Sequence, residues 1–303
     1  MQTLSQWLLS VGAIYLTFLS TGVLPFLLIG FFIGYTTHLA AKRIIELGGF
    51  RMMYITGWLG VPVHELSHVL AAWIGGHKVV RFAPFSPNPK TGQLGVVETK
   101  YDQKNRYQRI VGNFLIPIAP LVGGTTVLLL LTRWIIPGYS TTAYGGFRPP
   151  TSATLNDAIR WQSYLENVWL QLLQQISWLW HPELVTRWQT YPILYAMLCV
   201  AVHISPSIDD WKNFRKPLLW FIALLAIVSF FIGAIPAISE PAMNWWAIGL
   251  TWLWPMWLFL LLIVSLAVAP ILIFGSVFAP SESPQVRTAK PKKNPRKQTK
   301  GTE

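Results

Sequence analysis

Cysteine is nearly absent from this 303-residue sequence, and charged residues are scarce. The single cysteine, Cys199, excludes an internal disulfide, so the fold does not depend on an oxidising compartment. Only 12% of the residues are charged, whereas soluble domains carry about 25%. Hydrophobic residues make up 52%, and the mean hydropathy is +0.42. These values exclude an ordinary soluble globular protein and favour an integral membrane protein.

Acidic residues are half as numerous as basic ones, 12 against 24, which leaves a net charge of +12. A basic surplus of this size can indicate nucleic-acid binding, but no motif of that kind is present. The basic residues lie in the loops between apolar segments and in the C-terminal tail, residues 280–303, whose Pro, Ser, Lys and Arg are typical of disorder. We therefore expect no nucleic-acid partner, and we expect anionic lipid to meet the basic tail.

Six apolar segments recur along residues 1–279, and a helix of about 20 such residues crosses the roughly 30 Å of bilayer hydrocarbon. The sequence predicts an all-α polytopic membrane domain with about six transmembrane helices. The first is expected to be one long helix with a kink near Pro25, and the fourth to be short. The segments are Trp7–Leu39, Met52–Ile74, Ile110–Ile136, Tyr191–Ile204, Pro217–Ile238 and Trp245–Phe274.

Two connections between these segments carry structure of their own. Lys78–Phe85 and Leu94–Tyr101 are rich in β-forming residues and flank a turn with Pro, Asn and Gly, which predicts a small β-hairpin. Ala158–Trp180 mixes Leu, Ile, Val, Gln and Trp, which favours an amphipathic helix lying along the membrane interface. A soluble helix that caps the outer face is the alternative interpretation of that segment.

The distribution of basic residues predicts the orientation. With six spans, 17 of the 24 basic residues fall on the side that holds the hairpin and the tail. Because positive charge concentrates on the cytoplasmic side, both termini are expected in the cytoplasm and Ala158–Trp180 outside. Lys42, Arg43 and Arg51 fall on the other side.

A zinc-site motif, His-Glu-x-x-His, lies inside the second apolar segment as His64-Glu65-Leu66-Ser67-His68. Histidines four residues apart share one face of a helix, so both imidazoles can bind a single Zn²⁺. Glu65 reaches the rim of the same site, where it can act as general base toward a water held by the metal. A glutamate at membrane depth costs roughly 2.5 kcal/mol or more, which favours a functional role. The alternative is a buried His-Glu hydrogen-bond network without metal.

A third ligand is needed, and the sequence has only four aspartates. Asp209 and Asp210 stand together after a proline-containing break that follows the fourth apolar segment. In the predicted orientation this break and the motif helix both end at the cytoplasmic face, so we expect one of these two aspartates to complete a zinc site with His64 and His68. His203 is the next candidate, as an outer hydrogen-bond donor.

These residues resemble the site-2-protease family of intramembrane zinc metallopeptidases, in particular compact bacterial members without an inserted PDZ domain. The resemblance rests on the motif in a hydrophobic helix, the β-hairpin after it, and a Ser-Pro-x-x-Asp type of sequence on a later span, which begins at Ser205 and leads into the pair Asp209 and Asp210. It extends from about Gly57 to Lys212. The family's Asn-x-x-Pro and Asp-Gly elements are replaced by Ser205-Pro206-Ser207 and Asp210-Trp211.

The resemblance implies a zinc-dependent endopeptidase of a bacterial inner membrane that cuts membrane-embedded or juxtamembrane segments of other proteins. Glu65 would be the base, and His64 and His68 would be two of the ligands. The resemblance favours Asp210 as the third, because the residues that follow it are closest to the Asp-x-Lys-Gly type of ending of the compact members. Asp209 would then face the rim as a cap. Two other classes compete with this interpretation. A catalytically silent relative that serves as a membrane scaffold or assembly factor would not need Glu65. A transporter would need further ionisable residues in the other spans, which almost completely lack them.

Overall fold

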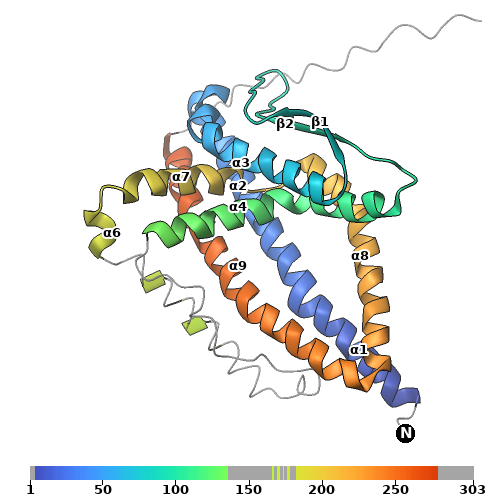
Figure 1. Ribbon diagram of the computed structural model, residues 1–303. Helices are drawn as coiled ribbons and strands as arrows, with labels where there is room; N and C mark the ends of the chain where they lie inside the picture. Colours follow the sequence, from blue (N-terminus) through green and yellow to red (C-terminus); the bar gives the residue numbers. More distant parts are fainter. Residues whose placement is uncertain are drawn as a thin grey trace, which may run out of the picture.

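The computed structural model describes residues 4–135, 166, 169–170, 173, 176–177 and 182–278, and these residues are mostly helical (Figure 1). The only two strands among them, β1 and β2, form one small sheet. The elements are α1 (Leu4–Phe18), α2 (Leu24–Gly48), α3 (Met53–Ile74), β1 (Lys78–Ala83), β2 (Val96–Lys100), α4 (Asn113–Ile135), α6 (Pro182–Thr186), α7 (Thr190–His203), α8 (Ile208–Ala234) and α9 (Pro236–Phe278).

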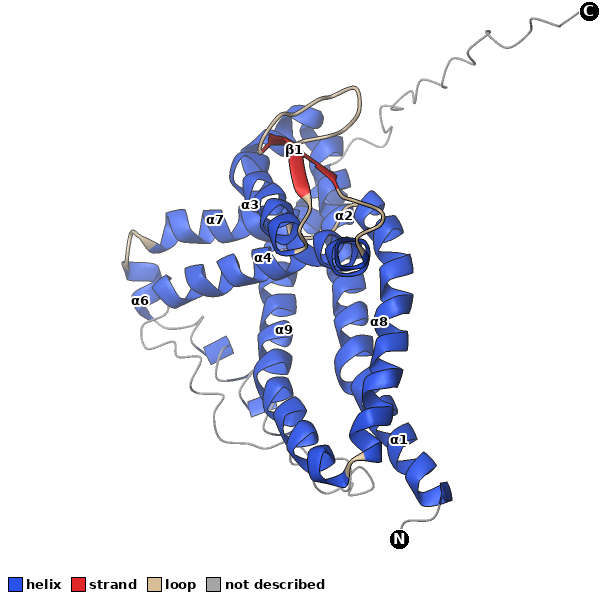
Figure 2. Ribbon diagram, turned by 45° about the vertical axis from the view of Figure 1, so that its right-hand side comes forward, coloured by secondary structure: helices blue, strands red, loops and turns tan. Residues whose placement is uncertain are grey.

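The long helices form two groups. Helix α3 packs against α4 and α7 with the hairpin over it, and we call these elements the site group. In the supporting group, α1 packs against α8 and α2 against α9. Figure 2 shows α2, α8 and α9 running roughly side by side while α4 and α7 cross them steeply. A shared apolar core, which includes Ile33, Leu121, Ile204 and Val264, joins the two groups.

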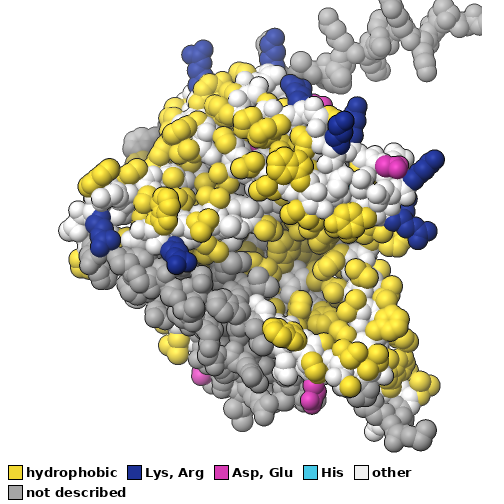
Figure 3. Space-filling view, in the orientation of Figure 1, with side chains coloured by type: hydrophobic (Ala, Val, Ile, Leu, Met, Phe, Trp, Pro, Cys, Tyr) yellow, Lys and Arg dark blue, Asp and Glu magenta, His cyan; other side chains and the backbone are white. Residues whose placement is uncertain are grey.

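Four helical stretches of the described chain are long and apolar enough to cross a membrane: Leu4–Gly48, Gln108–Ile135, Asp210–Ala234 and Trp257–Gly275. This agrees with a membrane protein, and hydrophobic side chains cover much of the face in Figure 3. The other two expected spans, α3 and α7, do not meet the same criterion, so the number six is not confirmed. The 14 residues of α7 extend only about 21 Å, and α3 includes the polar motif.

The helix boundaries differ from the expected ones at several places, and α9, for example, begins at Pro236 and not at Trp245. The first helical stretch runs from Leu4 to Gly48, and a π-helical segment, Leu19–Val23, lies just before Pro25 where a kink was expected. The amide of Leu24 donates to the Leu19 carbonyl, five residues back, which is the bond of a π-helical turn, and the next residue, Pro25, has no N–H to donate. Helix α8 begins nine residues before the expected Pro217, because Ser207 caps it.

The predicted β-hairpin is confirmed. Strands β1 and β2 pair antiparallel, with an irregularity between Val79 and Arg81. Helix α3 leads into β1 through Gly76, whose φ of 73° is a left-handed conformation that glycine tolerates. The amides of Gly76 and His77 bond back to the last turn of the helix, which closes a Schellman motif. The hairpin turns back over α3, where Phe85 lies against Gly57.

Two further expectations fall outside the described part of the chain. The interfacial helix expected over Ala158–Trp180 lies almost entirely beyond the described residues, and the basic tail, residues 280–303, lies wholly beyond them. Both stay predictions.

Candidate metal centre

Helix α3 places His64 and His68 one turn apart on one face, and each ring is held from outside by a backbone carbonyl. The Nδ1 of His64 lies 2.9 Å from the carbonyl oxygen of His203, at the end of α7. The Nδ1 of His68 lies 2.8 Å from the carbonyl oxygen of Ile116, in α4. A carbonyl only accepts, so each Nδ1 carries the hydrogen and each Nε2 presents a lone pair. This is the arrangement that orients histidine ligands in metalloproteins.

Asp210 brings a carboxylate to the same point from the first turn of α8. Its Oδ2 lies 3.6 Å from Nε2 of His68 and 4.0 Å from Nε2 of His64. The same oxygen accepts hydrogen bonds from the amide and the hydroxyl of Ser207, both at 2.7 Å, so Asp210 also completes the capping box of α8. Ser207 and Asp210 thus cap this helix together, and the cap expected of Asp209 stays a prediction. The side chain of Asp209 lies outside the described part of the chain.

The three donors fit a zinc ion. Their ligand atoms all lie within 4.8 Å of one another, and the two Nε2 atoms are 3.2 Å apart. Two lone pairs facing each other at that distance repel unless a proton or a metal ion lies between them. Tetrahedral zinc with bonds of about 2.1 Å places its ligand atoms roughly 3.4 Å apart. Small movements of Asp210 would bring the two longer separations to that value, which leaves a fourth position for water or substrate.

Glu65 lies beside this cluster but does not belong to it. It is buried, with 8% of its surface exposed, and among the described residues it has no hydrogen bond or ion pair. Its side chain faces the end of the hairpin turn. A Cβ added at Gly95 would come within 2.7 Å of Glu65 Cγ and Oε1. A carboxylate held by no structural partner is what a general base needs.

Small residues bring the three segments of the site close together. A side chain at Gly60 in α3 would strike the backbone carbonyl of Cys199 in α7. A side chain at Gly123 in α4 would strike Ser67, between the two motif histidines. The close approach of α4 and α7 to α3 therefore depends on glycine, and it brings the carbonyls of Ile116 and His203 within reach of the histidine rings.

The remaining histidines of interest do not join the cluster. The ring of His203 faces Thr56, with 3.1 Å between Nε2 and Oγ1, so His203 serves the site through its carbonyl and not through the side chain considered from the sequence. His77 is buried, with 4% of its surface exposed. Its Nε2 donates to the Gln108 carbonyl, and its ring stacks on Tyr101. Both rings link segments near the site.

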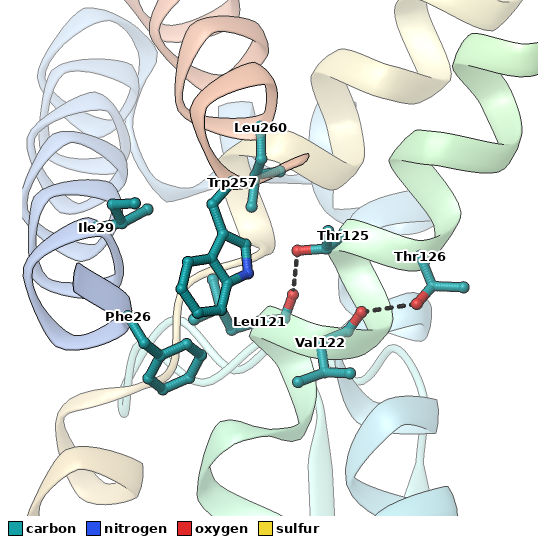
Figure 4. A pocket seen from close by; sticks show the side chains of 8 residues that line it. All are labelled: Phe26, Ile29, Leu121, Val122, Thr125, Thr126, Trp257 and Leu260. Carbon is teal, nitrogen blue, oxygen red and sulfur yellow. Dashed lines mark hydrogen bonds between the residues drawn. The ribbon is translucent and has the colours of Figure 1, made fainter. Parts of the chain in front are cut away.

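A separate apolar pocket of about 160 Å³ lies between α2, α4 and α9 (Figure 4). The only hydroxyls among its lining residues belong to Thr125 and Thr126, and both donate to carbonyls of their own helix. The lining of this pocket therefore offers no metal donor, whereas His64, His68 and Asp210 form a group of possible ligands among the described residues. Its lining residues are Phe26, Ile29, Leu121, Val122, Thr125, Thr126, Trp257 and Leu260.

No family model, no curated protein and no solved structure matches this chain. A function must therefore be inferred from its own residues. The structure brings together three donors of the kind zinc prefers, each with an outer hydrogen-bond partner, and a buried carboxylate next to them.

Proposed function

We propose that the protein is an intramembrane zinc metallopeptidase that hydrolyses peptide bonds in membrane-embedded or juxtamembrane segments of other proteins. The observation that carries this proposal is the convergence of His64, His68 and Asp210 beside the unpartnered carboxylate of Glu65. His64 and His68 come from α3 and Asp210 comes from α8, so His68 and Asp210 lie 142 positions apart in the sequence. The resemblance to the site-2-protease family supports the same reaction.

The proposed roles follow from the chemistry of the residues. Zinc, when bound, acidifies water and polarises a carbonyl oxygen. His64, His68 and Asp210 would hold the metal. Glu65 would take the proton from the attacking water and pass it to the leaving amine as the carbon–nitrogen bond breaks and the carbon–oxygen bond forms. The buried position of Glu65 limits the access of bulk water to this proton transfer.

The experiment that tests the proposal compares Glu65→Gln with the matched variant Glu98→Gln. Glu98 lies on the hairpin, is exposed and pairs only with Arg81 at 3.1 Å. Each purified variant is assayed for zinc content, and the membrane proteome of cells that express it is compared with that of wild type. We expect Glu65→Gln to retain about one zinc per chain while cleavage falls by roughly 10²- to 10⁴-fold, the contribution of a general base. Glu98→Gln should match wild type.

The other outcomes of this experiment separate the alternatives. Undiminished cleavage by Glu65→Gln would refute the peptidase mechanism. A wild-type protein that binds zinc but leaves the membrane proteome unchanged would point to the silent scaffold or assembly factor. Loss of zinc together with activity in Glu65→Gln would make Glu65 a ligand or a structural support.

The full topology belongs to the same proposal. In a six-span arrangement in a bacterial inner membrane, α3 and α7 also cross, both termini are cytoplasmic, and anionic lipid meets the basic tail. Reporter fusions at Glu303 and at Gln174 should then report opposite compartments. The six-span arrangement places three spans between these two positions. Fusions that report the same compartment would show that an even number of spans lies between them, and the six-span arrangement would be wrong.

A further inference from the structure

The carbonyl that orients His68 is one that the α-helix would ordinarily use itself. In an α-helix the carbonyl of residue 116 accepts from the amide of residue 120. Residue 120 is Pro120, which has no N–H. The Ile116 carbonyl instead accepts from Nδ1 of His68, at 2.8 Å.

We propose that Pro120 is a positioning residue, which keeps the Ile116 carbonyl free to orient His68 toward the metal. This inference rests on the proposed zinc function. Proline is the least favourable residue in a helix interior, and Pro120 is among the most deeply buried side chains of the protein. Pro120 in the middle of α4 lowers the stability of this helix, but it leaves the Ile116 carbonyl available to accept from His68.

The same principle operates at the second histidine. His64 is oriented by the carbonyl of His203, the last residue of α7. The amides that would extend the helical bonding beyond His203 do not do so. Pro206 has no N–H, and the amide of Ser207 donates to Asp210 at 2.7 Å. Both carbonyls that hold the metal-facing histidines therefore lie four residues before a position whose amide is absent or engaged elsewhere.

Pro117 provides an internal comparison. It is also buried in α4, and its nitrogen belongs to the same peptide group as the Ile116 carbonyl, so replacing it leaves the acceptor in place and adds no amide at position 120. The carbonyl that it leaves without an amide donor is that of Asn113, which accepts from neither motif histidine. If the prolines served only to bend α4, replacement of either one would disturb the site alike. If the missing amide matters, only position 120 should affect the metal.

The effect is expected to be partial, because a carbonyl oxygen has two lone pairs and can accept two bonds. An amide at position 120 would share the Ile116 carbonyl with His68 and draw it toward the helix axis. Loss of an outer-shell partner of a metal ligand costs 10- to 100-fold in metal affinity or activity. We expect Pro120→Ala to lower zinc affinity by about 10-fold, at the lower end of that range.

The experiment measures zinc affinity by chelator competition, and the d–d absorption spectrum after Co²⁺ substitution, on full-length protein purified in detergent. Wild type, Pro120→Ala and Pro117→Ala are compared. A fourth protein carries lactic acid at position 120, which has the side chain of alanine but an ester in place of the amide. We expect Pro120→Ala to bind zinc more weakly with an altered Co²⁺ spectrum, Pro117→Ala to resemble wild type, and the ester to restore affinity.

Two outcomes would overturn the inference. The ester could bind zinc as weakly as Pro120→Ala, which would assign the effect to loss of the proline ring. Pro120→Ala could bind zinc like wild type, which would show that the amide does not compete. Failure of wild type itself to bind zinc would instead refute the proposed function, so the two failures are distinguishable. The comparison between the ester and alanine holds even where both are less stable than wild type.

Discussion

The site group and the supporting group differ in how many of their polar atoms bond between segments. In the supporting group, hydroxyls mostly bond to their own helix one turn back, as Thr17 does to Ala13 and Ser229 to Leu225. Some hydroxyls of the site group do the same, as Ser67 and Thr125 do, but other polar atoms there reach between segments far apart in the sequence. His64 bonds to a carbonyl 139 residues away and Tyr195 to the carbonyl of Ile55, 140 residues away.

The difference shows what each group contributes. A hydroxyl that bonds to its own helix makes that helix compatible with lipid, but the bond does not fix the position of neighbouring helices. A bond between segments is formed only in one relative placement, so it fixes geometry. The bond from the Trp246 indole to Thr21 is an exception in the supporting group, and it lies at the π-helical segment. The supporting group is therefore built mainly by apolar packing, whereas the site group is positioned by directional contacts.

The largest effect expected from breaking this arrangement is at Asp210. Asp210→Asn keeps the size of the side chain and an oxygen that can accept from Ser207, but it removes the negative charge from the cluster. We expect zinc affinity to fall by more than about 100-fold, because the loss of a ligand exceeds the loss of an outer-shell partner. Chelator competition on purified protein measures this. Asp209→Asn is the matched control and should retain most of the zinc; the reverse pattern would assign the third ligand to Asp209.

A smaller effect is expected where α3 meets α7. Gly60→Ala introduces a Cβ that strikes the carbonyl of Cys199, and a backbone atom cannot rotate aside. Strain of this kind costs about 1–3 kcal/mol, more than the helix propensity gained. The control is Gly12→Ala in α1, whose Cβ meets nothing within 4 Å and which should be neutral or stabilising. Thermal unfolding in detergent compares the two. Equal unfolding temperatures would show that the site group tolerates separation of its helices.

The smallest expected effects distinguish a hydroxyl that bonds to another helix from a hydroxyl that bonds to its own helix. Thr56→Val removes the partner of the His203 ring, and we expect it to lower the free energy of unfolding by about 1–3 kcal/mol. Ser229→Ala removes a bond within one helix whose carbonyl keeps its ordinary backbone partner, so we expect about 0.5 kcal/mol or less. Chemical denaturation measures both changes. A larger cost for Ser229→Ala would invalidate the distinction between the groups.

Much of the fold could be predicted from local pattern. The motif helix was expected over Met52–Ile74 and begins one residue later, and the hairpin lies within its expected limits. Apolar runs and β-forming runs act over a few residues, so a single sequence reveals them. The early start of α8 was missed although Ser207 and Asp210 carry a capping signal, because the basic residues after them suggested a loop.

The site itself was predictable only in part. The pair His64 and His68 follows from helical spacing, and Asp210 was chosen from a resemblance. Nothing in local pattern indicated that Gly95 lies against Glu65, because the hairpin must first turn back over α3. Pro120 did carry a usable signal, since a proline inside a helix always leaves the carbonyl four residues earlier without its donor. Which donor then bonds to that carbonyl depends on how the neighbouring helices pack.

The sequence by itself determined that the chain is rich in apolar helices, that two histidines share a helix face with a glutamate beside them, and that a hairpin follows. These properties depend on composition and on spacing within one element. Only the tertiary structure decided which atoms meet: Asp210 Oδ2 with the two Nε2 atoms, and the carbonyls of Ile116 and His203 with the opposite side of each ring. Such meetings depend on how closely α4 and α7 approach α3, and that distance is set by glycines and by the apolar core, whose contacts join residues that are remote in sequence.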